Sequence, residues 1–261
     1  MIKYGIKIWN INKNWFPVAV ELFKTHKIDF IELYLAPEGA SKDELTMLKD
    51  IPVSIHAPHY SHGFNLFELN NEQIDSFKKN VIETADYLNS NFIVVHPGIG
   101  SDKEMFRNNS FKIFDKRILI ESMVKIGFVG KGGNRMDEGV GCFGHSLEQL
   151  EFINKKCGFG ICLDLAHSTA TAVSLGIDYK EFLMSLINNL NPNYFHISGG
   201  CQDSEEDDHL DVFDGNLDIK WMKKALQDRA KDKDIYLVFE TLKVGNKLEN
   251  DVKNIDYFKN L

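Results

Sequence analysis

The sequence predicts an α/β protein, a single (β/α)8 barrel that covers residues 1–261. Short apolar runs alternate along the chain with longer segments whose apolar residues recur at helical spacing. Several of these runs are continuously apolar, which is typical of parallel strands that are covered on both faces. Eight such runs in 261 residues match the size and the element order of one barrel. No Pro- or Ser-rich linker divides the chain, so we expect one domain.

Each expected strand is a short run rich in Ile, Val, Leu or Phe, and several of them end in a histidine or a carboxylate. The strands are predicted at Lys3–Ile8, Asp29–Leu35, Val53–His56, Phe92–His96, Arg117–Glu121, Gly160–Asp164, Tyr194–Ile197 and Ile235–Glu240. The helices are predicted at Phe16–His26, Lys42–Lys49, Asn71–Leu88, Ser146–Lys155, Tyr179–Leu190, Ile219–Arg229 and Asn250–Asn260. Two long connections, Ser122–His145 and Ser198–Asn216, remain between these elements. Loops of this length in a compact domain are usually functional or mobile.

The charge balance argues against a broad electrostatic grip on nucleic acid. The chain has 30 Lys and Arg against 38 Asp and Glu, which gives a formal net charge of −8. A nucleic-acid site would therefore need a local basic patch or bound metal ions. The four cysteines form no C-x-x-C pair, which favours reduced thiols. The chain shows no apolar run of membrane-spanning length and no signal core, so we expect a cytoplasmic protein without a membrane partner.

Nine polar residues follow the ends of the expected strands or lie in the loops directly after them. They are His56, His96, Glu121, Asp164, His167, His196, Asp207, His209 and Glu240. The carboxyl ends of barrel strands converge on one face, where active sites are built. Burying several carboxylates side by side is costly unless cations compensate them. Five imidazoles and four carboxylates suit zinc, with manganese or iron as alternatives, so the pattern predicts a metal site.

The short motifs around these residues resemble those of the endonuclease IV family (AP endonuclease family 2), within the xylose-isomerase-like barrel superfamily. The matching motifs, in chain order, are IHAP (55–58), VVHPG (94–98), ILIE (118–121), CLDLAH (162–167), FHIS (195–198), DDH (207–209) and FET (239–241). The resemblance extends over nearly the whole chain. The VVHPG motif and the D-L-A-H spacing are its more specific parts.

The resemblance implies three zinc ions held by the nine residues. His56, His96 and Glu121 would hold one ion, and Glu121 would also join Asp164, His196 and Glu240 around the second. His167, Asp207 and His209 would hold the third. The resemblance also implies the activity: cleavage of the phosphodiester 5′ of an abasic site in DNA, for which bound metal ions make a protein nucleophile unnecessary. Glu121, Glu240 and His167 are the candidate catalytic residues.

The DNA-contacting surface of that family is less well matched. The first strand region, GIKIWNINKNWF, lacks the family's His-Val-Ser motif, and His59 with Tyr60 beside it stands where the family has a tyrosine. We expect His59, Tyr60, Lys131 and Arg135 to be the residues that contact substrate.

Sugar isomerases and 3-epimerases of the same superfamily are the main alternative. They resemble the chain in Glu121, Asp164, His196 and Glu240, which would hold one divalent ion beside a small sugar. The two glutamates would then exchange a proton at a carbon next to a carbonyl group. A barrel that binds metal and ligand without catalysis is a third possibility. His56, His96, Asp207 and His209 discriminate, because a one-metal isomerase does not need them.

Overall fold

The strands close into a parallel barrel, as the sequence predicts. The structure, a computed structural model, describes residues 1–129, 134–135, 141–243 and 248–261; the side chains of 128–129 and 134–135 are outside the description. In this part of the chain the closed sheet has the order β1-β2-β3-β4-β5-β8-β9-β10, and β10 pairs with β1. The bounds are β1 (Ile2–Trp9), β2 (Phe30–Tyr34), β3 (Val53–His56), β4 (Ile93–Val95), β5 (Ile118–Glu121), β8 (Gly160–Asp164), β9 (Tyr194–Ile197) and β10 (Ile235–Phe239).

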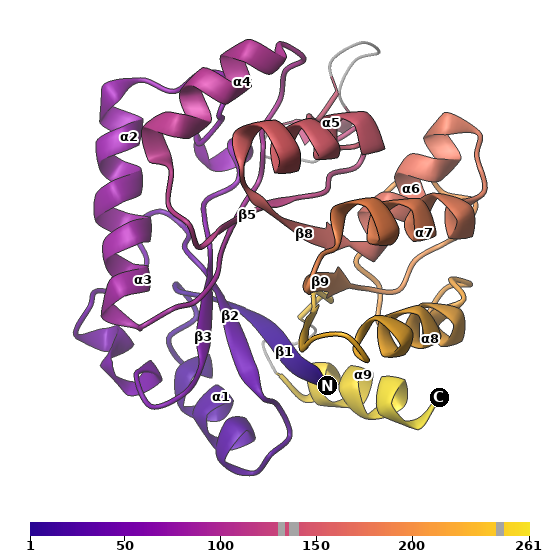
Figure 1. Cartoon of the computed structure of the whole chain (residues 1–261). Coiled ribbons are helices and arrows are strands. Elements are labelled where there is room, and N and C mark those ends of the chain that lie inside the picture. Colours follow the sequence, from indigo (N-terminus) through magenta and orange to yellow (C-terminus); the bar gives the residue numbers. More distant parts are fainter. Residues whose placement is uncertain (130–133, 136–140, 244–247) are drawn as a thin grey trace.

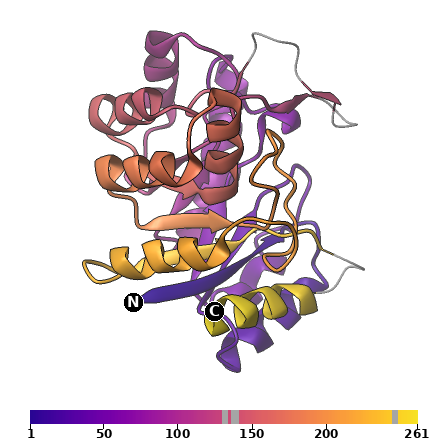
Figure 2. The same ribbon diagram turned by 90° about the vertical axis from the view of Figure 1, so that its right-hand side faces the viewer.

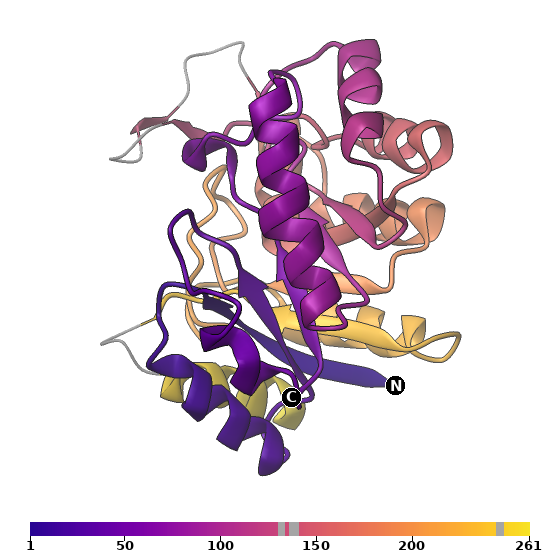
Figure 3. The same cartoon turned by 90° about the vertical axis from the view of Figure 1, so that its left-hand side faces the viewer.

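Helices surround the barrel (Figure 1). The α-helices of the described residues are α1 (Trp15–Lys24), α2 (Asn71–Phe77), α3 (Glu83–Tyr87), α4 (Lys103–Ser110), α5 (Leu147–Glu151), α6 (Leu165–Leu175), α7 (Tyr179–Leu190), α8 (Ile219–Arg229) and α9 (Glu249–Asn260). Short 3-10 turns lie at Glu44–Leu48, Tyr60–His62 and Phe111–Ile113. The π-helical turn Lys78–Ile82 joins α2 to α3 in one column on the outside of the barrel (Figure 3), and a second π turn, Phe152–Lys156, extends α5.

The apolar interior has two parts. Most buried apolar side chains lie between the strands and the surrounding helices. A second cluster, which includes Phe30, Leu119 and Tyr194, comes from alternate strand positions that face the barrel axis. At Gly5 a Cβ atom would lie 2.5 Å from the Phe30 ring, so the glycine leaves room for that ring inside the barrel. Above this cluster the inward positions become polar.

The carboxyl ends of the strands and the long connections lie on one side of the molecule (Figure 2). The connection after β5 contains a short antiparallel pair, β6 (Phe128–Val129) and β7 (Asn134–Arg135). The connection 198–216 folds back on itself, since Gly199 bridges Leu210 and Gly200 bridges Gly215. None of the helices in the described part of the chain has the length and apolar character that a bilayer crossing requires.

Several element boundaries differ from the expectation. His96 and Glu240 directly follow β4 and β10 rather than closing them, and the expected helix Lys42–Lys49 is a 3-10 turn. Two helices were not expected, α4 and α6. The α6 helix is rich in Ala, Ser and Thr and is buried around most of its circumference, so its sequence has little amphipathic periodicity. The prediction that residues 1–261 form a single domain stays a prediction.

Candidate metal centre

The nine residues expected as metal ligands lie together at the carboxyl ends of the strands. They form three groups, and within each group the ligand atoms lie within 4.8 Å of one another. The first group is His56, His96 and Glu121; the central group is Glu121, Asp164, His196 and Glu240; the third group is His167, Asp207 and His209. The parallel strands of the closed barrel, with α6 and the connection 198–216, bring these side chains around one axis, although up to 184 positions separate them in the sequence.

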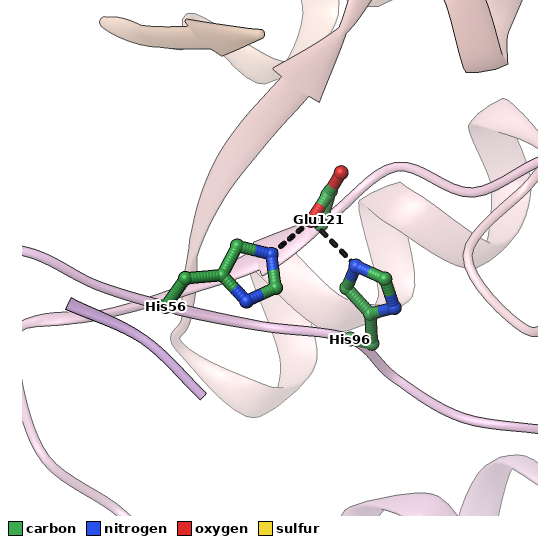
Figure 4. A group of neighbouring side chains, drawn as sticks. All are labelled: His56, His96 and Glu121. Carbon is green, nitrogen blue, oxygen red and sulfur yellow. Dashed lines mark hydrogen bonds and ion pairs between the residues drawn. The ribbon is translucent and has the colours of Figure 1, made fainter. Parts of the chain in front are cut away.

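In the first group, two imidazole rings point at one carboxylate (Figure 4). His56 Nε2 lies 3.1 Å and His96 Nε2 lies 2.9 Å from Glu121 Oε2. The other ring nitrogen of His56, Nδ1, lies 2.8 Å from the carbonyl oxygen of Ala57. A proton on Nδ1 donated to this carbonyl leaves the Nε2 lone pair directed at the group, as in a metal-ligating histidine.

The other oxygen of Glu121 faces the central group. Oε1 lies 3.2 Å from His196 Nδ1 and 3.5 Å from His167 Nδ1. His196 Nδ1 is also 3.0 Å from Glu240 Oε2 and 3.9 Å from Asp164 Oδ2. Glu121 is fully buried, so solvent does not compensate its charge. It therefore belongs to two groups at once, with one oxygen toward each.

Asp164 also begins a helix. Its Oδ1 accepts a hydrogen bond from the backbone N–H of His167 at 2.8 Å, which makes Asp164 the N-cap of α6. Because the cap uses Oδ1, Oδ2 remains directed toward the central group. Burial raises the pKa of Asp164, which favours the neutral acid unless a cation is near.

The third group joins α6 to the connection 198–216. Asp207 Oδ2 lies 3.0 Å from His167 Nε2 and 2.7 Å from His209 Nε2. Burial lowers the pKa of both histidines, but the carboxylates outweigh it: the pKa of His167 is well above its usual range, and that of His209 rises to about 9. His209 has a φ of 48°, a strained backbone for a residue other than glycine.

The donor set fits divalent cations. The side chains offer only nitrogen and oxygen ligands, which suit zinc, manganese or iron. Several buried atoms have no hydrogen-bond partner within the described residues, among them both ring nitrogens of His96, Asp207 Oδ1 and Glu240 Oε2. His96 Nε2 approaches Glu121 closely without hydrogen-bond geometry, as two lone pairs do when they converge on a cation.

Two charged residues of this region were missed by sequence reasoning. Lys7 in β1 and Glu32 in β2 point into the barrel beneath the central group, and both are buried. Lys7 Nζ lies 2.6 Å from Glu240 Oε1, and Glu32 Oε2 lies 2.9 Å from His196 Nε2. Each interrupts an otherwise apolar strand, KYGIKIW and DFIELYL, and that interruption was the available signal.

Of the four residues expected to contact substrate, the structure describes the side chains of two, His59 and Tyr60. The His59 ring lies 4.7 Å from the His96 ring, at the edge of the first group, and burial together with His96 and His56 lowers its pKa to about 2. The ring of Tyr60 lies 3.6 Å from that of His59, tilted by 40°, and Tyr60 packs against the buried cluster of Met123 and Cys142. Lys131 lies outside the described residues, and Arg135 is in β7, where its side chain is outside the description.

Comparisons with known proteins establish the fold. No protein-family model matches the chain, and no curated protein sequence matches it. The structure is similar to endonuclease IV from Thermus thermophilus, with a TM-score of 0.69 and 21% identity over 99% of this chain and 98% of that one. A putative xylose isomerase from Rhodospirillum rubrum has a TM-score of 0.66 and 9% identity over 99% of this chain and 98% of that one.

A sugar-converting enzyme also shares the barrel. D-psicose 3-epimerase from Clostridium cellulolyticum, solved with D-tagatose, has a TM-score of 0.57 and 13% identity over 98% of this chain and 91% of that one. These likenesses, together with the closed parallel sheet, confirm the (β/α)8 barrel fold that the sequence predicts. All three are enzymes by name: one is an endonuclease, and the other two are an isomerase and an epimerase.

Proposed function

We propose that the protein is a metal-dependent phosphodiester hydrolase that cleaves DNA 5′ of abasic sites, with up to three zinc ions and with manganese or iron as possible occupants. The observation that carries the proposal is the division of Glu121 between two complete groups, with a third group beside them. An isomerase with one divalent ion needs neither the first nor the third group. The likeness of the fold to endonuclease IV from Thermus thermophilus supports the same reaction class.

The charge of the centre favours a phosphate ester over a neutral sugar. The charged side chains around the three groups are five carboxylates, Glu32, Glu121, Asp164, Asp207 and Glu240, and one lysine, Lys7. With neutral histidines, five negative charges less one positive charge leave four to compensate. Three divalent ions give the centre a net charge of +2, which attracts a phosphate ester. A single ion would leave −2, which repels phosphate and tolerates an uncharged sugar.

The chain's own residues bind and orient in this scheme. Divalent cations, when bound, would polarise the phosphoryl oxygens and lower the pKa of a bound water. None of the nine ligand residues is a Ser or a Cys, and in this scheme the protein supplies the ligands and the shape of the site. Glu121 and Glu240 would ligate the ion of the central group. His167 lies between the central and the third group, because its Nδ1 is 3.5 Å from Glu121 and its Nε2 is 3.0 Å from Asp207. His59, Tyr60, Lys131 and Arg135 are proposed to contact the substrate.

Sugar isomerisation or epimerisation is the second candidate. The observation in its favour is that the central group, with Glu121 and Glu240 on either side of His196, is complete without the other two groups. The epimerase from Clostridium cellulolyticum shares the fold. In that reaction the two glutamates would move a proton at a carbon beside a carbonyl group.

One assay distinguishes the two functions. The full chain, loaded with zinc or manganese, is incubated with an abasic-site duplex, with the undamaged duplex as control, and with a panel of ketoses. The proposal predicts a nick 5′ of the abasic site and no ketose conversion. The His209→Ala variant, which lacks a ligand of the third group only, should lose the nicking activity. Ketose turnover that needs Glu121 and Glu240 and survives in His209→Ala, without any nicking, would establish the isomerase instead.

A further inference from the structure

A buried pair of opposite charges lies directly beneath the central group. Lys7 and Glu32 are register partners on the neighbouring strands β1 and β2, and 6% of Lys7 and 0% of Glu32 is exposed. Their closest approach is 3.6 Å, between Lys7 Nζ and Glu32 Oε1. Neither residue belongs to any of the three groups of possible ligands. Two buried charges are costly to keep, so their contacts with the ligand residues need an explanation.

Glu32 contacts the side of His196 that faces away from the group. Its Oε2 lies 2.9 Å from His196 Nε2 and accepts a hydrogen bond from the Tyr194 hydroxyl at 2.8 Å. The Tyr194 hydroxyl in turn lies 2.5 Å from Ser54 Oγ, and these contacts hold the Glu32 carboxylate in one orientation. A carboxylate that accepts the Nε2 proton leaves Nδ1 of His196 as the ligand atom, aimed at Glu121 and Glu240.

Lys7 contacts a second ligand residue of the central group, Glu240. Its Nζ donates to Glu240 Oε1 at 2.6 Å, while Glu240 Oε2 faces His196. One oxygen of Glu240 is therefore occupied by the ammonium group, and only the other is directed at the central position. The cation also stands beside that position, where it repels a divalent ion.

We propose that Glu32 and Lys7 are positioning residues with opposite effects on the central ion. Glu32 fixes the ring of His196 and strengthens its ligation. Lys7 restricts Glu240 to one ligating oxygen and weakens ion binding, which keeps a coordination position open for substrate. The inference rests on the proposed function only in that the central group binds a divalent ion, and the isomerase alternative needs the same ion.

The test measures ion affinity rather than activity. Zinc is titrated into the metal-free full chain against a competing chelating dye, and the dissociation constants and the number of bound ions are compared. Glu32→Gln keeps the side-chain volume and removes the charge, and Lys7→Met keeps the length and removes the ammonium group. Lys243→Met is the matched control, because Lys243 pairs with the buried Asp251 outside the three groups.

The expected shifts have opposite signs. Glu32→Gln should weaken one ion by about tenfold to a hundredfold, the usual effect of removing the outer partner of a ligating histidine. Lys7→Met should tighten one ion by about tenfold or more, because a repelling charge is removed and an oxygen of Glu240 is freed. Lys243→Met should leave all ion affinities unchanged. If Lys7→Met does not fold by circular dichroism, Lys7→Gln replaces it, since its neutral amide can still donate to Glu240.

The possible failures are separable. A wild-type chain that binds no divalent ion overturns the proposed function itself. The second failure is a wild-type chain that binds ions while both variants bind them as tightly as the wild type, or both bind them more weakly. This result overturns the roles given to Glu32 and Lys7 and leaves the proposed function in place.

Discussion

Replacing Glu121 by glutamine should weaken two metal positions with one substitution. Glu121 Oε2 faces the two imidazoles of the first group, and Oε1 faces His196 in the central group. The amide has nearly the same shape and no net charge, so Glu121→Gln removes one negative charge from both groups. The third group has its own carboxylate, Asp207, and should be much less affected.

The magnitude follows from the size of the groups. Their ligand atoms lie within 4.8 Å of one another, so an ion among them is at most about 4 Å from the Glu121 carboxylate. A unit charge at that distance from a divalent ion contributes about 2 kcal/mol even at the dielectric constant of water, and about 8 kcal/mol at an effective constant of about 20. The lower figure already corresponds to a loss of about 30-fold in affinity for each of two ions.

The assay is the ion content of purified protein after dialysis against buffered zinc, measured by mass spectrometry. Glu121→Gln should lose more than one ion per chain, and His209→Ala, which removes a ligand of the third group only, should lose one. Circular dichroism of both variants checks that the barrel has folded. Equal ion loss in the two variants would refute the shared role of Glu121 and with it the three-ion arrangement.

Three further outcomes are expected. Asn254 of α9 donates a hydrogen bond to Asp211 and accepts one from the N–H of Val212, both at 2.6 Å, and so holds the connection that carries the third group in place. Asn254→Ala should therefore weaken the binding of one ion by about tenfold in the dye titration. An unchanged titration would show that α9 does not support the third group. Burial raises the pKa of Asp251 to about 6, so the folded state prefers the protonated carboxyl group and loses stability as the pH rises from about 4 to about 6. The free energy of unfolding of Asp251→Asn in urea, relative to that of the wild type, should therefore increase across this pH range. A constant difference would contradict the raised pKa. If DNA is the substrate, few local cations supplement the metal ions, so a plot of log binding constant against log salt concentration should have a slope of about −3. A slope near −8 would require a basic surface, which a chain with a net charge of −8 is not expected to have.

The strand ends explain how much of the site could be predicted. The strands Val53–His56, Gly160–Asp164 and Tyr194–Ile197 have the predicted bounds, because an apolar run stops at a turn or a polar residue in each case. In a parallel barrel, the carboxyl ends of the strands meet at one common mouth. The rule brings His56, Asp164 and their counterparts together, whatever their separation in sequence.

The supporting charges could not be found in the same way. Glu32 lies in the middle of its strand, and its partner His196 is 164 positions away on β9. Only closure of the barrel brings the two side chains into contact. The sequence does not indicate which distant residue a charged side chain inside an apolar run will contact, so Lys7 and Glu32 were not predicted as part of the site. The helix α6 was missed for a related reason, since a helix buried on most sides has no polar face to mark its period.

The most direct measurement is anomalous diffraction at the zinc absorption edge from crystals of the zinc-loaded full chain. We expect three peaks: one beside His56 and His96, one beside Asp164, His196 and Glu240, and one beside His167, Asp207 and His209, with Glu121 between the first two. A single peak confined to the central group after full loading would contradict the three-ion centre and favour the isomerase.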